Sequence, residues 1–409
     1  MTNSLRQGAT KLGINLRAMG SALALAFSLG FVVSSFLSSA QAETFTVLYT
    51  FTGYEDADPY AGLISDAQGN LYGAASGDGK AGACGLLFKL DKAGKETVLY
   101  TFADSGVDGC SPMGTLTRDK GGNFYGTTSV GGLYNNGVVF ELDTTGKLTV
   151  LYSFQFGPGG SNPIAGVIRD SSGNLYGTAL NGGITACDIN LIGCGVVFKL
   201  DTAGHETVLH TFAGTDGRHP WGPLATDGGG NLYGTTFAGG SGCGHQQGCG
   251  TVFKIDKQGR FRVLHRFAGG NKDGAGPRDG VVLQADGTLF GTTYSGGRGN
   301  CPGGCGTVFK LDAKGREAVL HSFTTTPRYG RHPYGGLTLD TAGNLYGTAL
   351  RGEAFKLNQA GKTTILVNNT GGGDFAALLR DNAGTLYGTT SGGGNCSPPL
   401  CGTVFKITP

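Results

Sequence analysis

The chain has 409 residues, 78 of them glycine, and its formal net charge is +2. Such a glycine content can indicate disorder, but 39% hydrophobic and 10% aromatic residues are enough for a packed core, so tight turns explain the glycine better. The near-neutral charge provides no basic surface for a phosphate backbone and argues against a nucleic-acid partner.

The first 42 residues have the features of a targeting segment. Three basic residues precede a largely apolar run over 18–37, and Ala40-Gln41-Ala42 offers the small-x-small site that signal peptidase requires. We therefore expect residues 1–42 to be a signal peptide and the mature chain to begin at Glu43, with a net charge of −1 from 28 basic and 29 acidic residues. An uncleaved anchor is the alternative, because the run is about long enough to span a bilayer. No second apolar run of that length follows, so no membrane span is expected after cleavage.

Residues 43–409 contain four short strings that each recur seven times. A string like LYG has its aromatic residue at Tyr72, Tyr125, Tyr176, Tyr233, Phe290, Tyr346 and Tyr387. A string like VFKL has its phenylalanine at Phe88, Phe140, Phe198, Phe253, Phe309, Phe355 and Phe405. A string like TVLYTF begins at Thr46, Thr97, Thr149, Thr207, Arg262, Ala318 and Thr364, and an apolar step ends at Asp66, Asp119, Asp170, Asp227, Gln284, Asp340 and Asp381. Four strands in each of seven units predict an all-β, seven-bladed β-propeller with four-stranded blades.

Alternation of apolar residues predicts half-buried strands. One face of the strand that ends at Phe51 would carry Val47, Tyr49 and Phe51. One face of the strand that begins at Leu86 would carry Leu86, Phe88 and Leu90.

The phase of the repeat predicts how the ring closes. The mature chain opens with a lone fourth-type strand at 46–51 and ends with three strands of a last blade over 376–407. We expect the N-terminal strand to complete the last blade, which would remove the exposed sheet edges of an open array. An open solenoid would instead need atypical capping repeats at both ends.

Two short connections in each blade share the pattern Asp-x-x-Gly, as in Asp66-x-x-Gly69 and Asp91-x-x-Gly94. An aspartate that begins a turn bonds the backbone ahead of it, and glycine supplies a positive φ. We interpret these aspartates as turn formers and not as catalytic acids or metal ligands. The other two connections are long, vary between blades and lie on the opposite face, where function is expected.

The ten cysteines of an exported chain predict disulfides. We expect the pairs Cys84–Cys110, Cys187–Cys194, Cys243–Cys249, Cys301–Cys305 and Cys396–Cys401. A metal site at Cys243, His245 and Cys249 is the weaker interpretation because its spacing is not typical of zinc ligands. No metal or other cofactor is predicted.

The residue that follows a recurring proline should face the central channel. These seven residues are Tyr60, Met113, Ile164, Trp221, Arg278, Tyr334 and, where Asp374 replaces proline, Phe375. They could form a stacking ring or an apolar plug, and the apolar members favour the plug slightly.

Two further features suggest a ligand site on the varied face. Arg218-His219 and Arg331-His332 precede the prolines of two blades, and an Arg-His pair beside an aromatic ring suits an anionic or sugar ligand. In the sixth blade the loop after the second strand is nearly absent, which should leave a notch. The candidate ligand-binding residues are Tyr60, Arg218, His219, Trp221, Arg278, Arg331, His332, Tyr334 and Asp374. By contrast His210, His265 and His321 replace a strand tyrosine and are interpreted as structural.

The strings GNLYGTT, CGTVFKLD and TVLYSF resemble the GloVer tandem-repeat, choice-of-anchor family of bacterial surface proteins over about residues 44–409. The resemblance implies a bacterial protein of the periplasm or the extracellular space and carries no established activity. The chain is more distantly similar to streptogramin-lyase-like, gluconolactonase-like and NHL-type propellers. Their catalytic histidine, glutamate and metal-ligand sets have no clear match here.

The first functional hypothesis is a secreted binding propeller whose partner is an extracellular ligand, such as a polysaccharide or another envelope component. The second is a carbohydrate-active lyase or hydrolase in which His219 and His332 act with neighbouring arginine and aspartate residues. The third is a purely structural envelope protein. The repeated Arg-His pairs favour a binder and the blade-specific changes favour an enzyme, so the sequence leaves all three open.

Overall fold

The computed structural model describes residues 43–52, 58–77, 84–103, 105–187, 191–240, 243, 248–325, 331–350, 352–368, 376–392 and 402–409. These residues belong to the unit Ala42–Pro409. The predictions for residues 1–42, His245, Asp374, Phe375, Cys396 and Cys401 lie outside them.

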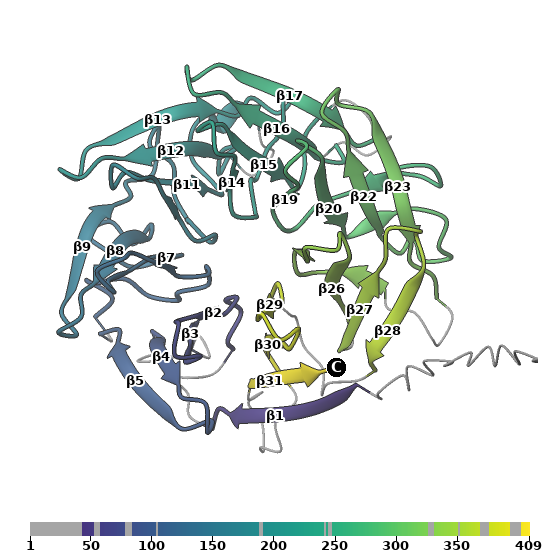
Figure 1. Ribbon diagram of the computed structural model, residues 1–409. Helices are drawn as coiled ribbons and strands as arrows, with labels where there is room; N and C mark the ends of the chain where they lie inside the picture. The colour runs from purple at the N-terminus through teal and green to yellow at the C-terminus, as the bar shows by residue number, and fades with distance from the viewer. Residues whose placement is uncertain are drawn as a thin grey trace, which may run out of the picture. The chain divides into compact units, whose positions relative to one another are not determined.

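Seven antiparallel sheets surround a common centre, each with its short strand innermost (Figure 1). Blades 1 to 3 are β2 (Ile64–Ser65), β3 (Leu71–Ala75), β4 (Leu86–Leu90), β5 (Glu96–Thr101); β6 (Thr117–Arg118), β7 (Phe124–Thr128), β8 (Val138–Leu142), β9 (Leu148–Ser153); and β10 (Ile168–Arg169), β11 (Leu175–Ala179), β12 (Val196–Leu200), β13 (Glu206–Thr211). Blades 4 and 5 are β14 (Ala225–Thr226), β15 (Leu232–Thr236), β16 (Thr251–Ile255), β17 (Phe261–Arg266); and β19 (Val282–Leu283), β20 (Leu289–Thr293), β22 (Thr307–Leu311), β23 (Glu317–Ser322). Blades 6 and 7 are β25 (Thr338–Leu339), β26 (Leu345–Leu350), β27 (Glu353–Leu357), β28 (Thr363–Val367); and β29 (Leu379–Arg380), β30 (Leu386–Thr390), β31 (Thr403–Thr408), β1 (Thr44–Thr50). The predicted seven-bladed, all-β propeller is confirmed.

Four small elements lie between the blade strands. A 3-10 helix, η1, spans Thr185–Cys187, and β18 (Gly274–Ala275) pairs with β21 (Ser295–Gly296). The strand β24 (Arg331–Pro333) pairs with the C-terminal end of β26, on the same edge as β25.

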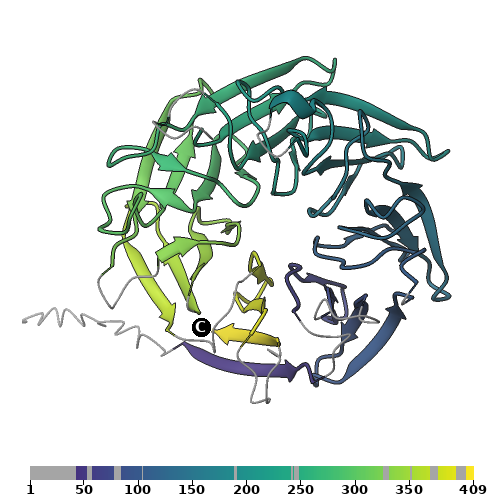
Figure 2. The same ribbon diagram turned by 180° about the vertical axis from the view of Figure 1, so that it is seen from behind.

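The first and last strands of the described chain share one sheet. Strand β1 pairs antiparallel with β31, from Thr44 opposite Thr408 to Thr50 opposite Thr403. Figure 2 shows β1 in purple along the outer edge of the yellow last blade. Phe51, which follows β1, contacts Phe88 of blade 1 with ring centroids 5.1 Å apart, so the N-terminal segment completes blade 7 and also contacts blade 1.

The second and third strands of each blade are more buried than alternation predicts. All five residues of β3 are buried, and in β4 only Lys89 is partly exposed. The expectation of half-buried strands was wrong here, because a neighbouring blade covers each face of the sheet. In β1 a β-bulge between Val47 and Tyr49 shifts the side-chain alternation and leaves Val47 44% exposed, so Val47 does not share the buried face of Phe51.

One close contact explains why LYG and VFKL recur together. Gly73 of β3 lies opposite Phe88 of β4, and a Cβ atom on Gly73 would lie 2.6 Å from the Phe88 ring and 2.9 Å from Leu63. The same glycine–phenylalanine contact recurs at Gly126/Phe140, Gly177/Phe198, Gly234/Phe253, Gly291/Phe309, Gly347/Phe355 and Gly388/Phe405. The glycine therefore provides the space into which the aromatic ring of the next strand packs.

A ladder of aromatic contacts joins successive blades. The phenylalanine after an outer strand packs edge-on against the third-strand phenylalanine of the next blade, with centroids 5.1–5.4 Å apart. The pairs are Phe51/Phe88, Phe102/Phe140, Phe154/Phe198, Phe212/Phe253, Phe267/Phe309 and Phe323/Phe355. All twelve rings have at most 1% of their surface exposed, so these pairs form the main inter-blade core.

Hydrogen bonds confirm that the recurring aspartates form turns. Asp66 Oδ1 accepts the amide protons of Gln68 and Asn70 at 3.0 and 2.9 Å, and Gly69 has φ +81°. Asp66 Oδ2 also accepts the hydroxyl proton of Tyr72 at 2.8 Å. In blade 5 both partners change together, because Gln284 replaces the aspartate and Phe290 lacks the hydroxyl.

Four of the predicted disulfides lie in the described residues and are confirmed: Cys84–Cys110, Cys187–Cys194, Cys243–Cys249 and Cys301–Cys305. Within the described part of the chain, no helix is long and apolar enough to cross a membrane.

Candidate functional site

A central pocket of about 120 Å³ is lined by residues from all seven blades. The residues after the recurring prolines reach it as the sequence predicts, since Tyr60, Met113, Ile164, Trp221, Arg278 and Tyr334 line its wall. Small residues such as Gly62, Gly114 and Ala165 lie between them. The pocket combines aromatic rings with one guanidinium group and one carboxyl group, those of Arg278 and Asp279.

Arg278 lies among four aromatic rings from three neighbouring blades. Its Cζ atom lies 4.1 Å from the ring centroid of Tyr294, 4.8 Å from Tyr334, 5.4 Å from Phe237 and 5.6 Å from Trp221. Cation–π contacts of this kind stabilise a guanidinium without neutralising its charge. Its Nε is buried and has no hydrogen-bond partner among the described residues. The group is therefore held in place with its charge still available to an anion.

Asp279 is the carboxyl group of the same pocket. Its oxygens accept the amide protons of Gly280 at 2.6 Å and Gly336 at 2.7 Å. The bond from Gly336 links blade 5 to blade 6. Burial raises its pKa to about 6, against the lowering effect of these two hydrogen bonds. A carboxyl group that titrates near pH 6 can hold or release a proton under mild conditions.

The Arg-His pairs occupy backbone positions that recur around the ring. The residue before the recurring proline has φ between 52° and 64° in the six blades where it is described, and these residues are Asp58, Ser111, Asn162, His219, Gly276 and His332. The His219 amide donates to the Cys194 carbonyl at 2.9 Å, and the Ser111 amide donates to the Cys84 carbonyl at 2.8 Å. Arg218 forms a β-bridge with Ala238 and is only 4% exposed, and Arg331 pairs with Leu350. The two Arg-His pairs therefore lie at a backbone position that the repeat places at the connection between blades.

Arg218, His219, Arg331 and His332 are not among the residues that line the central pocket. His332 is nevertheless linked to it, because its ring stacks on Tyr294 at 4.5 Å and its Nδ1 lies 2.7 Å from the Tyr294 carbonyl oxygen. Tyr294 in turn contacts Arg278. Trp221 and Tyr334 flank Arg278 from the two neighbouring blades. A ligand role for Arg218, His219, Arg331 and His332 stays a prediction.

The loop of blade 6 is as short as the sequence indicates. Strand β26 ends at Leu350 and β27 begins at Glu353. Strand β24 lies along this hairpin, so the edge left by the short loop is partly covered. Because Asp374 lies outside the described residues, the predicted notch also stays a prediction.

Asp279, Phe237 and Tyr294 are not among the candidate residues that the sequence indicates. Asp279 stands where the other blades have alanine or glycine, at Ala61, Gly114, Ala165, Gly222, Gly335 and Ala376. Phe237 and Tyr294 stand where the other blades have serine or leucine. These residues could have been found as positions that differ from the other copies of the repeat, because such differences cluster in blades 4 and 5 around Arg278.

Solved structures of similar fold include virginiamycin B lyase from Staphylococcus aureus, with a TM-score of 0.60, 12% identity and coverage of 90% of this chain and 99% of that one. A streptogramin B lyase structure has a TM-score of 0.57 and 13% identity, with the same coverage. The extracellular domain of a chain described as a hybrid two-component system from B. thetaiotaomicron has a TM-score of 0.55 and 14% identity, over 90% of this chain and 41% of that one. At these identities the likeness shows the fold alone.

No protein with a curated description matches the chain by sequence. The model of the Gloeobacter/Verrucomicrobia repeat matches residues 31–241 and 185–373, which together span most of the chain. The resemblance seen in the repeat strings is thereby confirmed. The chain belongs to the Gloeobacter/Verrucomicrobia repeat family.

Proposed function

We propose that this chain is a secreted binding propeller whose central pocket binds an anionic extracellular ligand, with an acidic saccharide as the best fit. The observation that carries the proposal is the Arg278 guanidinium, held among four rings at a pocket that every blade lines. A guanidinium binds a carboxylate through charge-assisted hydrogen bonds. The neighbouring faces of Trp221 and Tyr334 suit a sugar ring.

Export is part of this proposal. Four disulfides in the described residues are typical of an oxidising compartment. The signal segment at 1–42 would direct the chain there, with Glu43 as the new N-terminus. N-terminal sequencing of exported protein is expected to begin at Glu43, and a retained apolar run would refute cleavage.

The binding experiment uses the chain's only tryptophan, Trp221, as a fluorescent probe within the pocket. Acidic and neutral oligosaccharides of equal length are titrated into wild-type protein, Arg278→Met and a control, Arg316→Met. Arg316 is an exposed arginine that pairs with Asp312 on one of the Asp-x-x-Gly turns, on the face opposite the long, variable connections. We expect wild type and R316M to prefer the acidic oligosaccharide and R278M to bind it about 10- to 100-fold more weakly, because hydrogen bonds to charged groups contribute about 1.5–3 kcal/mol. Equal affinity of R278M and wild type would refute the proposal.

Asp279 supports a second candidate function, a carbohydrate-active lyase or hydrolase at the same pocket. Its pKa of about 6 suits a general acid or base, which typically contributes 10²- to 10⁴-fold to a rate. Product analysis of any bound oligosaccharide tests this function with Asp279→Asn. An enzyme is expected to lose turnover in D279N while affinity stays within a few fold, whereas intact wild-type substrate after long incubation would leave only the binding function.

A further inference from the structure

The outer strands carry a recurring contact between blades. A tyrosine or histidine near the end of one outer strand bonds an acidic residue, and the fold offers two places for that partner. In one, an aspartate comes from the following loop, as in His210–Asp216 at 2.9 Å. In the other, a glutamate begins the outer strand of the next blade, as in Tyr152–Glu206 at 3.2 Å.

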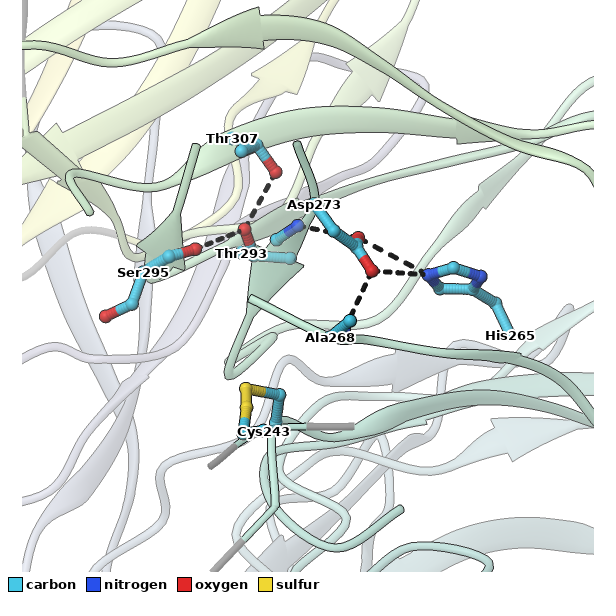
Figure 3. A network of polar contacts seen from close by, with 9 residues as sticks. Cys243, His265, Ala268, Asp273, Thr293, Ser295 and Thr307 are labelled. Atoms are coloured by element: carbon cyan, nitrogen blue, oxygen red, sulfur yellow. Dashed lines mark hydrogen bonds and ion pairs between the residues drawn. A yellow bond between two sulfur atoms is a disulfide. The ribbon is translucent and has the colours of Figure 1, made fainter. Parts of the chain in front are cut away.

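Both places are filled between blades 4 and 5. His265 of β17 lies with Nε2 3.3 and 3.4 Å from the carboxylate oxygens of Asp273, as Figure 3 shows. Glu317 begins β23 of blade 5, and one ligand atom from each of the three residues lies within 4.8 Å of the others. In the described part of the chain, no other three histidine, cysteine, aspartate or glutamate side chains meet in this way.

The cluster is anchored but not neutralised by the protein. The amides of Ala268 and Gly274 donate to Asp273 at 2.8 and 2.7 Å and fix its carboxylate. Glu317 Oε1 is buried without a hydrogen-bond partner among the described residues. Two carboxylates therefore face one imidazole, which leaves the cluster short of positive charge.

The equivalent interface between blades 3 and 4 has the same histidine–aspartate pair without the second carboxylate. There Phe261 occupies the position of Glu317 and stacks on His210 at 3.5 Å, while His210 and Asp216 lie at a normal hydrogen-bond distance. The His265–Asp273 separation is longer and equals about the 3.3 Å edge of a tetrahedron whose bonds to the central ion are about 2.0 Å. One imidazole nitrogen and two carboxylates suit zinc or a similar transition metal, with a fourth position for water.

We propose that His265 Nε2, Asp273 and Glu317 bind a divalent transition-metal ion, with Zn²⁺ as the best fit, that links blades 4 and 5. The site lies on the outer strands and does not depend on the anion-binding pocket. A cation there would offset the two carboxylates and connect elements of both blades, so it should also stabilise the fold.

The test uses metal-free protein with intact disulfides and Zn²⁺ alone as the probe. Isothermal titration and metal analysis after desalting are run on wild type, Glu317→Gln, Glu317→Phe and the control Asp216→Asn. The E317F variant reproduces the blade 4 residue Phe261, so it should fold, and circular dichroism checks this.

Wild type and D216N are expected to bind one Zn²⁺ per chain and to melt at a higher temperature with zinc than without it. E317Q is expected to bind at least about tenfold more weakly, and E317F should lose both binding and the zinc-dependent shift. Ca²⁺, which prefers six to eight oxygen ligands, should not compete. Absence of zinc binding by wild type, or equal binding by wild type and folded E317F, would overturn the proposal.

Discussion

Replacement of Asp279 by asparagine should remove one pH-dependent contribution to the free energy of unfolding of the propeller. In the folded chain the Asp279 pKa is raised from 3.8 to about 6, whereas the unfolded chain should retain the ordinary value near 3.9. Between these values the unfolded state loses its proton first, so the free energy of unfolding falls as pH rises. Below about pH 3.8 both states are protonated, and above about pH 6 both are charged. A shift of about two pKa units corresponds to at most about 3 kcal/mol.

The assay is urea unfolding of oxidised protein, followed by the fluorescence of Trp221, at several pH values from 3.5 to 7. The difference in unfolding free energy, wild type minus D279N, should fall by up to about 3 kcal/mol across this range. Asparagine keeps one acceptor oxygen, so the loss of one of the two hydrogen bonds from the Gly280 and Gly336 amides adds an offset that does not depend on pH. A difference that is constant or rises with pH would refute this account of the pocket.

Asp66→Asn is the matched control because Asp66 titrates in the opposite direction. Desolvation raises its pKa, but hydrogen bonds from Asn70, Tyr72 and Gln68 outweigh this effect and lower it to about 2. The contribution of the ionised Asp66 carboxylate to the free energy of unfolding is therefore lost only as pH falls below about 3.8. Between pH 4 and pH 7 the difference between wild type and D66N should stay flat.

Three further predictions test the fold and the pocket. Gly73→Ala should lower the free energy of unfolding by about 1–3 kcal/mol, because its Cβ would lie 2.6 Å from the Phe88 ring; unchanged urea unfolding would contradict the glycine–phenylalanine packing. Deletion of residues 43–51 should expose the edge of β31 and promote aggregation, and unchanged light scattering and melting temperature would show that β1 is dispensable. Tyr334→Ala should weaken binding of an acidic oligosaccharide by about 1 kcal/mol beyond the loss of contact area, and intact affinity in the Trp221 titration would exclude stacking on this ring.

The fold could be predicted because each blade repeats the same local solution. Asp66, Gly73 and Phe88 appear in recognisable form in almost every copy, since the turn, the close contact and the inter-blade core impose the same demands each time. Strand burial was harder to predict, because alternation along one strand does not reveal the second sheet that covers its other face. The bulge at Val47 likewise leaves no mark in the spacing of apolar residues.

The candidate site could be predicted only in part. Position after a proline identifies Tyr60, Trp221, Arg278 and Tyr334 as pocket residues, because the repeat places these positions at the axis. The contacts of Arg278 with Phe237 and Tyr294 come from different strands, and sequence spacing does not show which rings converge. The His219 and His332 pairs were singled out because they repeat, yet their backbone conformation also occurs at Asp58, Ser111, Asn162 and Gly276 and is therefore a general feature of the repeat.

The most direct test of the central claim is a crystal structure of the mature protein with a bound acidic oligosaccharide. We expect a carboxylate of the ligand within hydrogen-bonding distance of the Arg278 guanidinium and a sugar ring against Trp221 or Tyr334. A ligand bound elsewhere on the propeller, with the central pocket unchanged, would contradict the claim.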